Sequence, residues 1–373
     1  MKEGINYKRL KDVAKYYNGL TYKPTDVTEE GVLVLRSSNI QDNKLSLFDQ
    51  VRVSIKIDEK LKVHKGDLIM CSRNGSKSLI GKVAIIPEEF GELTFGTFMM
   101  IFKSEYNPFL YYFFLSDVFK KQIWKGEATM INQITRYMLD DVCLPVPPLP
   151  EQQRIVEYLD SQFAKIEALK ANAAQQLQAA KDLFQSALKD LMTPKEGWEK
   201  KIITDVCDNY FAGGDAPKIK SKNRTEEYKY PIYSNGVENE GIYGYTNSYR
   251  VNDVAITIAA RGTIGATFIR MEPFTPIVRL ITLIPNPKII IAKFLYYLVK
   301  NYDWGHTGAS IPQLTIPALK DIIISFPTKE KQQQIVSQLD DLSNKIKALQ
   351  SNYEQTITLC SDLKQSLLKQ IFE

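Results

Sequence analysis

The sequence predicts a mixed α/β (α+β) fold built twice, with two globular domains and two long coiled-coil helices related by a pseudo-twofold internal repeat. Three observations predict this. Residues 151–192 recur at 331–372, displaced by 180 residues without a gap and with 18 of 42 aligned pairs identical. Shorter matching strings precede both copies in the same order. Apolar residues in the duplicated segment follow spacings of three and four, as in a coiled-coil seam.

The first globular domain is expected at residues 1–148 and the second at residues 194–327. Each contains short apolar strings separated by turn residues, which is typical of short strands with a few helices. Several strings correspond in the same order in the two domains. Residues 66–70 match 252–256 as a buried strand, 73–75 match 261–262, and 81–83 match 265–267. Residues 109–112 match 294–297 as a short helix, 131–135 match 311–315, and 142–146 match 322–326 as strands. The loops between these strings differ in sequence, as expected if the two domains recognise different targets.

Two spacer helices are expected, the central one at residues 149–193 and the C-terminal one at 328–373. Prolines around residue 148 are tolerated only at a helix start. At about 1.5 Å per residue, each helix would be roughly 60 Å long. We expect antiparallel packing within the chain, which places the globular domains at opposite ends. The predicted packing residues are Val156, Leu159, Phe163, Ile166, Leu177, Phe184 and Leu191 in the first helix, and Val336, Leu339, Ile346, Ile357, Leu367 and Ile371 in the second.

The charge distribution favours the globular domains as the place where a polyanion would bind. The chain carries 48 Lys and Arg against 43 Asp and Glu, a formal net charge of +5. The excess lies in the two globular stretches, whereas the helical segments are close to neutral. A basic surface attracts nucleic acid. Solubility alone would also account for so small an excess, so both explanations remain open.

Motifs for catalysis and metal binding do not emerge from the sequence. The four cysteines are isolated and only two histidines occur, so we expect no zinc site. Residues 75–82 fail the phosphate-binding GxxxxGK[ST] pattern in both spacing and final residue. The chain begins without an apolar signal segment and contains no run long enough to span a bilayer, so we expect a cytoplasmic protein that does not enter a membrane.

The segment at the start of each long helix resembles a known family. Residues 147–156 read PPLPEQQRIV and residues 327–336 read PTKEKQQQIV, and both are similar to the proline–EQ–IV segment of type I restriction–modification specificity (S) subunits. Supporting strings lie at 19–21, 35–40, 66–69 and 133–135. The second copy is looser, because Glu330 is shifted by one position and Pro312 replaces the equivalent of Asn132. The resemblance covers the whole chain.

This resemblance implies a DNA-recognition subunit that is not itself an enzyme. Its two target-recognition domains would each read one half of a bipartite double-stranded DNA site. Its helices would set the spacer and dock two methyltransferase subunits, with restriction or translocase subunits added in the full complex. S-adenosylmethionine, ATP and Mg would be bound by those partners and no cofactor by this chain. The alternatives are an orphan or decoy specificity subunit, a DNA-independent coiled-coil scaffold, and an enzyme with an unrecognised site.

Candidate DNA-contacting residues are polar side chains on loops at corresponding places in both domains. Arg can contact guanine and Asn can contact adenine through paired hydrogen bonds. The same Ser and Asn residues are also typical of turns, so a structural role remains open for each. Gln133, Thr135, Gln313 and Thr315 would either contact DNA or fix a loop. The candidates are Arg36, Ser37, Asn39, Arg73, Asn74, Ser76 and Lys77 in the first domain, and Tyr233, Ser234, Asn235, Arg261 and Thr263 in the second.

Overall fold

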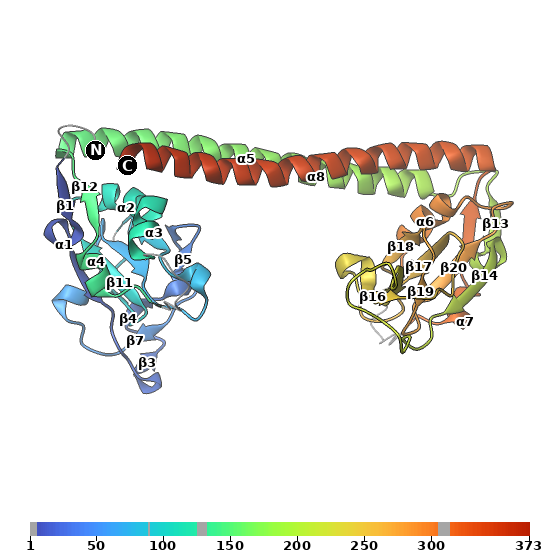
Figure 1. Cartoon of the computed structure of the whole chain (residues 1–373), viewed down its shortest axis with the longest axis horizontal. Helices are drawn as coiled ribbons and strands as arrows, with labels where there is room; N and C mark the ends of the chain where they lie inside the picture. The colour runs from blue at the N-terminus through green and yellow to red at the C-terminus, as the bar shows by residue number, and fades with distance from the viewer. Residues whose placement is uncertain (1–5, 89, 125–132, 305–313) are drawn as a thin grey trace. The chain divides into compact units, whose positions relative to one another are not determined.

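The computed structural model describes residues 6–88, 90–124, 133–304 and 314–373. The chain forms two compact units: the first comprises residues 1–173 and 353–373, and the second residues 174–352. The two long helices are α5 (Leu149–Met192) and α8 (Lys329–Phe372), each of 44 residues (Figure 1). Each helix contributes one part to each unit, so each unit holds one globular domain together with a pair of helix segments.

The first unit contains a four-stranded antiparallel sheet with a smaller mixed sheet beside it. The larger sheet has the order β2 (Lys15–Asn18), β11 (Met99–Lys103), β8 (Leu68–Cys71), β9 (Val83–Ile85). The smaller has the order β10 (Leu93–Phe95), β4 (Val32–Leu35), β7 (Arg52–Val53), β3 (Val27–Thr28), and β10 pairs with β4 in parallel. The pairs β1 (Tyr7–Arg9) with β12 (Cys143–Pro145) and β5 (Ile40–Gln41) with β6 (Lys44–Leu45) complete the unit.

Aromatic side chains pack two helices of the first unit on the larger sheet, since Phe114 contacts both Phe102 of the sheet and Phe119 of the next helix. The helices of this unit are α1 (Leu10–Val13), α2 (Asn107–Leu115), α3 (Asp117–Ile123) and α4 (Arg136–Asp140). Phe113 of α2 packs its ring 5.4 Å from Phe372 at the end of α8. Both side chains are almost completely buried, so the end of α8 forms part of this core.

The second unit repeats this topology. Its larger sheet has the order β14 (Cys207–Ala212), β20 (Ile281–Pro285), β17 (Ala255–Ile258), β18 (Thr267–Arg270). Its smaller sheet has the order β16 (Ile242–Thr246), β15 (Tyr230–Tyr233), β19 (Thr275–Pro276), again with one parallel pair. The pair β13 (Glu199–Ile202) with β21 (Ile323–Phe326) matches β1 with β12, and α6 (Ala292–Lys300) and α7 (Ile316–Leu319) match α2 and α4. The predicted internal repeat is confirmed.

Hydrogen bonds fix the correspondence between the two units residue by residue. Gly81 N donates to Cys71 O at 2.8 Å, and Gly265 N donates to Ala259 O at 2.9 Å. Met70, which precedes Cys71, therefore corresponds to Ile258. The predicted match of strand 66–70 with 252–256 was wrong by two residues, whereas the matches of 73 with 261 and 81 with 265 are confirmed. A shift of two keeps every side chain on its own face of the sheet, so the apolar pattern does not reveal it.

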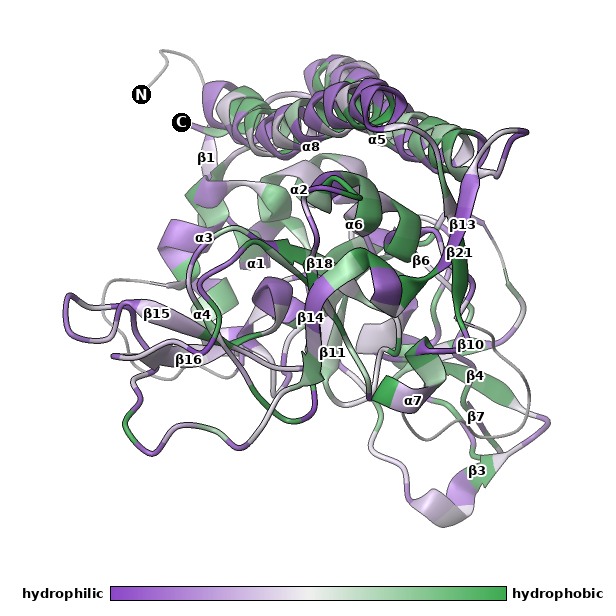
Figure 2. Ribbon diagram, turned by 90° about the vertical axis from the view of Figure 1, so that its right-hand side faces the viewer, coloured by the Kyte–Doolittle hydropathy of each residue, from purple (hydrophilic) through white to green (hydrophobic). Residues whose placement is uncertain are grey.

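The two long helices pack in antiparallel fashion within each unit. In the first unit Leu159 of α5 shares a core with Leu368 of α8, and in the second Leu188 of α5 shares one with Leu339 of α8. Hydrophobic and hydrophilic residues alternate along both helices, as expected for helices with one apolar stripe (Figure 2). Every predicted packing residue is buried or half-buried except Ile357, which is 37% exposed and was predicted wrongly. A seven-residue repeat drifts around a straight helix, so its positions do not all stay inside.

A repeated glutamine joins each globular domain to its long helix. Gln152 donates to Pro147 O at 2.7 Å, and Gln332 donates to Pro327 O at 2.9 Å. Gln332 also accepts a hydrogen bond from Ile291 N at 2.8 Å, just before α6. Both glutamines are buried. The glutamine of the duplicated proline–EQ–IV segment therefore fixes the angle at which the chain enters the helix.

Short 3-10 turns occupy several connections, including two that carry candidate residues. Ser37–Asn39 forms η2 and Lys77–Leu79 forms η4. The remaining turns are η1 (Pro24–Asp26), η3 (Glu59–Leu61), η5 (Ile203–Val206) and η6 (Glu238–Gly241). Their side chains include both exposed ones, such as Lys77, and buried ones, such as Asn39.

Candidate nucleic-acid interface

Four strands of the first unit end at one edge and surround a groove of about 840 Å³. The loops that follow β2, β4, β8 and β10 line it, and they contribute residues 20–22, 36–38, 74–75 and 96–99. We call this the first loop surface. Because β4 and β10 run parallel, their carboxyl ends meet at the same edge, which brings together loops that are far apart in the sequence.

A close approach of two backbones holds this edge together in both units. A Cβ atom on Gly19 would lie 2.0 Å from Gly96 O, and one on Gly213 would lie 2.8 Å from Ile277 N. Adjacent bridges pair Leu20 with Gly96 and Gly214 with Ile277. Only glycine permits such an approach. The same device therefore builds a second loop surface in the second unit, from the loops that follow β14, β15, β17 and β19.

Asn39 lies within the first loop surface but does not face the groove. Its side chain is 1% exposed, donates to Ser46 O at 2.9 Å and Asp49 O at 2.7 Å, and accepts from Arg36 N at 2.8 Å. An amide with three such partners has no edge left for a base. We therefore correct the prediction for Asn39: it shapes the loop that carries Arg36 and Ser37.

Arg36 lines the groove and is anchored by a carboxylate. Its Nη2 lies 2.5 Å from Asp49 Oδ2, which also accepts from Ser38 Oγ at 2.7 Å. The hydrogen bond from Ser38, followed by the attraction of Arg36, keeps the pKa of Asp49 below its usual range. The Arg36 side chain is 38% exposed. The side chain is therefore partly accessible and is held in one orientation by Asp49.

Arg73 is the most accessible of the predicted arginines in the first unit. It is exposed, its guanidinium carbon lies 5.4 Å from the centre of the Phe98 ring, and its backbone N donates to Phe98 O at 3.1 Å. Asn74, beside it, donates to Ser37 Oγ at 3.1 Å. These contacts bring four predicted residues, Arg36, Ser37, Arg73 and Asn74, to one surface. The exposed Ser76 and Lys77 follow at its margin.

The second loop surface is organised by Asn235. Its side chain donates to Val278 O at 2.7 Å and accepts from Ala260 N at 2.7 Å, so it links three loops. Arg261 and Thr263 follow directly on the exposed loop after β17, and Ser234 is half-buried beside them. Arg261 occupies the position that Arg73 holds in the first unit.

Tyr233 was predicted as a DNA contact, but it is a core residue. It is 6% exposed, and the guanidinium carbon of Arg270 lies 3.5 Å from its ring centre. Arg270 is itself 2% exposed and donates to Thr257 Oγ1 at 3.0 Å and Glu240 O at 2.7 Å. Burial lowers the pKa of Arg270 and raises that of Tyr233. This stacked pair supports the second loop surface from beneath and does not reach its exterior.

The loop before β20 carries two residues that sequence reasoning missed. Val278 and Arg279 have φ of 53° and 60°, and both are exposed. They correspond to Thr97 and Phe98 in the first unit. A β-branched residue with positive φ is a genuine outlier that is often found at functional sites. The sequence offered no signal for it, because glycine or asparagine is the usual mark of this conformation.

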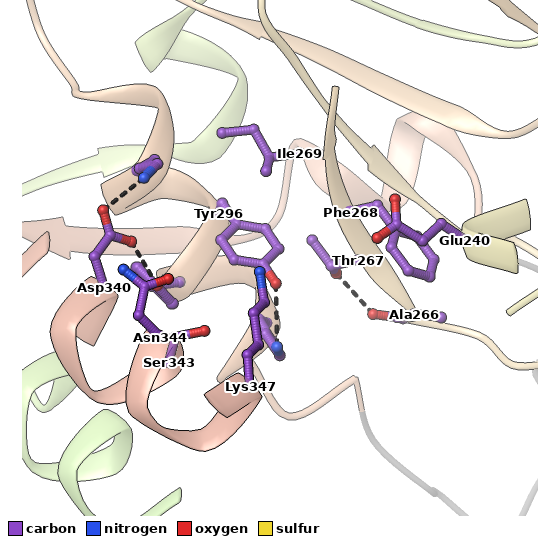
Figure 3. A pocket seen from close by; sticks show the side chains of 14 residues that line it. Glu240, Ala266, Thr267, Phe268, Ile269, Tyr296, Asp340, Ser343, Asn344 and Lys347 are labelled. Carbon is purple, nitrogen blue, oxygen red and sulfur yellow. Dashed lines mark hydrogen bonds and ion pairs between the residues drawn. The ribbon is translucent and has the colours of Figure 1, made fainter. Parts of the chain in front are cut away.

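A second cleft, of about 660 Å³, lies in the second unit between α6, β18 and α8 (Figure 3). Asp340 receives hydrogen bonds there from Tyr297 at 2.8 Å and Lys293 at 2.5 Å, and Lys300 donates to Tyr296 at 3.1 Å. The cleft therefore contains satisfied polar pairs. In the part of the chain that the structure describes, no three His, Cys, Asp or Glu residues gather as metal ligands would.

The architecture defines a duplicated protein whose two α/β domains each display a loop surface and pack on shared long helices. The chain belongs to the family of the type I restriction modification DNA specificity domain, which matches residues 2–179 and 195–359. Both copies of the internal repeat are thus members of one family. Specificity subunits of this family are non-catalytic.

Several named relatives agree with this assignment. A putative type I specificity subunit of Mycoplasma pneumoniae is 34% identical over 215 residues, which span 56% of this chain and 58% of that protein. The StySPI specificity subunit of Salmonella potsdam is 25% identical, and the match covers 100% of this chain and 89% of the relative. The match to the EcoKI specificity subunit of Escherichia coli, at 29% identity, covers 50% of this chain and 42% of the relative.

Solved structures confirm the fold. A chain from a study of complex assembly and conformational transition of the type I R-M system gives a TM-score of 0.80 at 18% identity, covering 100% of this chain and 98% of that one. The HsdS subunit from Thermoanaerobacter tengcongensis gives 0.61 at 19% identity, covering 100% and 97%. Over the described residues, none of the helices combines the length and apolar character that crossing a membrane requires.

Proposed function

We propose that this chain is the DNA-recognition subunit of a type I restriction–modification enzyme, with each unit reading one half of a bipartite site. The observation that carries the proposal is the duplicated loop surface. The same strand ends, glycine approach and arginine position recur in both units, while the surrounding side chains differ. A shared scaffold with divergent loops suits two domains that do the same task on different sequences.

The chemistry of the two surfaces suits contact with base edges. Arg73 and Arg261 are exposed at equivalent positions, and an arginine can donate two hydrogen bonds to guanine in the major groove. Each such paired contact contributes roughly 1–3 kcal/mol of discrimination between bases. The stacking of Arg73 on Phe98 limits its freedom before binding, which lowers the entropic cost of the contact.

The long helices would serve as spacer and docking surface. Removing one heptad from each helix, about 10 Å of length, should then change the spacer and leave both half-sites unaltered. Two methyltransferase subunits are the proposed partners, together with restriction or translocase subunits. These partners would bind S-adenosylmethionine, ATP and Mg in the cytoplasm, and the present chain would contribute recognition alone.

The decisive experiment is to express the chain with its methyltransferase in a host that lacks other methylation, and to map methylated adenines across the genome. One bipartite motif, two short half-sites with an unspecified spacer, is the expected result. Arg73→Ala and Arg261→Ala, made separately, should each relax a different half-site. A single uninterrupted motif would contradict reading by two modules. Equal affinity for all sequences at fixed salt would instead indicate a scaffold.

A further inference from the structure

Equivalent loops of the two units carry opposite charge. Residues 20–31 join β2 to β4 in the first unit, and residues 214–229 join β14 to β15 in the second; we call them the acidic loop and the basic loop. The acidic loop contains Lys23 against Asp26, Glu29 and Glu30. The basic loop contains Lys218, Lys220, Lys222, Arg224 and Lys229 against Asp215, Glu226 and Glu227. The net charge therefore has opposite sign in these two loops, although the two units share one topology.

The contacts of the two loops show that they are equivalent. Each begins at the close backbone approach, where Leu20 bridges Gly96 and Gly214 bridges Ile277. Each then pairs with the antiparallel neighbour of the central strand of the smaller sheet, which is β7 beside β4 in the first unit and β16 beside β15 in the second. Thr28 of the acidic loop pairs with β7, and Ser221 of the basic loop bridges Tyr245 of β16 in antiparallel fashion.

The basic loop is continuous with the second loop surface. Gly214 O accepts a hydrogen bond from Val278 N at 2.8 Å, and Gly213 O accepts one from Arg279 N at 2.9 Å. The two exposed residues of positive φ are therefore hydrogen-bonded to the first residue of this loop and to the residue before it. The start of the basic loop is therefore bonded directly to the loop that carries Arg279.

Aromatic rings hold several of the cations in place. Lys220 Nζ lies 5.5 Å from the ring centre of Tyr243, and Arg224 lies 6.0 Å from that of Tyr245. Arg224 also pairs with Glu272 at 2.7 Å. Lys218 and Lys222 are exposed beside them. Attraction to the ring face of Tyr243 restrains the ammonium group of Lys220 without neutralising it, so its positive charge stays available to an anion.

We propose that the basic loop binds the phosphates of DNA next to the half-site read by the second unit, and that the acidic loop makes no such contact in the first. The two half-sites are then bound with unequal electrostatic contributions. This inference rests on the proposed function. Phosphates fit better than an acidic protein surface, because the loop continues the backbone of the reading loops and every half-site is flanked by phosphates.

The test compares the full chain with a variant carrying Lys218→Gln, Lys220→Gln, Lys222→Gln and Arg224→Gln. A matched control carries Lys195→Gln, Lys200→Gln, Lys288→Gln and Lys320→Gln, which removes the same charge from exposed lysines on other elements of that unit. Fluorescence anisotropy would measure binding to a duplex with the mapped motif and to a scrambled duplex across a salt series. Thermal melting would verify that all three proteins are folded.

Loss of up to four phosphate contacts should reduce the slope of log K against log salt by about 0.9 per contact. Affinity for both duplexes should fall together, so their ratio stays constant, and the control should keep the parental slope. An unchanged slope in the loop variant would overturn the inference. So would intact DNA binding with lost methyltransferase association, which would assign the loop to an acidic protein surface. A parental chain that fails to prefer its motif would refute the proposed function instead.

Discussion

Tyr297 of α6 donates a hydrogen bond from its hydroxyl to Asp340 of α8 at 2.8 Å. The equivalent residues of the first unit, Tyr112 of α2 and Asp160 of α5, form the same bond. In each unit this is a link between the globular domain and a long helix. A charged acceptor makes the link stronger than an ordinary hydrogen bond. The domain is therefore fixed to its helix by a polar contact at the margin of an apolar core.

Tyr297→Phe should destabilise the protein by about 1.5–3 kcal/mol, because it removes a hydrogen bond to a charged group. Asp340 would retain Lys293, which limits the loss. Tyr296→Phe is the matched control on the same helix turn, since Tyr296 is half-buried and its hydroxyl accepts only from Lys300 among the contacts described. Urea denaturation monitored by circular dichroism gives both values. Equal stability of the two variants would show that the link contributes nothing.

Alkaline pH should weaken the same links. Burial, followed by the hydrogen bond to a carboxylate, raises the pKa of Tyr112 and Tyr297 above the ordinary value. A tyrosine whose folded-state pKa is raised contributes its full stability below the unfolded pKa of about 10 and loses it as pH rises beyond that value. Urea midpoints should therefore fall above pH 10, and less steeply in a Tyr112→Phe, Tyr297→Phe double variant. Parallel curves for the variant and the parent would contradict this assignment.

The sequence was sufficient to predict the repeat, the helices and the position of the loops. Duplicated apolar spacing survives divergence because core packing constrains it, so Leu159 and Leu339 were identified correctly as buried packing residues. Arg73 and Arg261 were matched correctly because glycines at 81 and 265 mark the same turn in both copies.

What the sequence could not predict depends on hydrogen-bond and stacking partners that the folded chain brings together. Asn39 reads as an exposed turn residue, yet its acceptors lie at residues 46 and 49 and enclose it. Tyr233 is buried because Arg270, from another strand, stacks on it. Such partners become neighbours only when the loops and sheets fold. Sequence spacing alone therefore assigns a polar side chain to a loop without showing which way it points.

The duplicated glutamine offers a comparison between the two units. Gln332→Ala should be the more harmful change, because Gln332 is paired with Pro327, Ile289 and Ile291. Gln152→Ala should cost less, since one bond to Pro147 is lost and Gln152 Oε1 has no hydrogen-bond partner among the described residues. Each buried group left unpaired costs about 1–3 kcal/mol. Urea midpoints of the two variants would measure both losses of stability. A larger loss for Gln152→Ala than for Gln332→Ala would refute this account.

The helix seam provides a second matched pair. Leu339→Ala should cost about 2–5 kcal/mol, because it opens a cavity at a fully buried position. Ile357→Ala, at a position that the heptad pattern also marked as internal, should cost less than about 1 kcal/mol, because Ile357 is 37% exposed. Thermal and urea denaturation of the two variants would measure these two costs in stability. Similar costs would mean that Ile357 is packed in solution.

Arg73→Ala and Asn39→Ala should separate recognition from folding on one surface. Arg73 is exposed and reaches outward over Phe98, so its loss should reduce discrimination at one half-site by roughly 1–3 kcal/mol and leave stability nearly unchanged. Asn39→Ala leaves two carbonyls and one backbone amide unpaired, so it should lower stability by about 1–3 kcal/mol or more. Duplexes altered in one half-site at a time, with melting curves for both variants, provide the measurement. If Arg73→Ala relaxed both half-sites, or if Asn39→Ala changed the motif of a fully stable protein, the division of roles on this surface would be wrong.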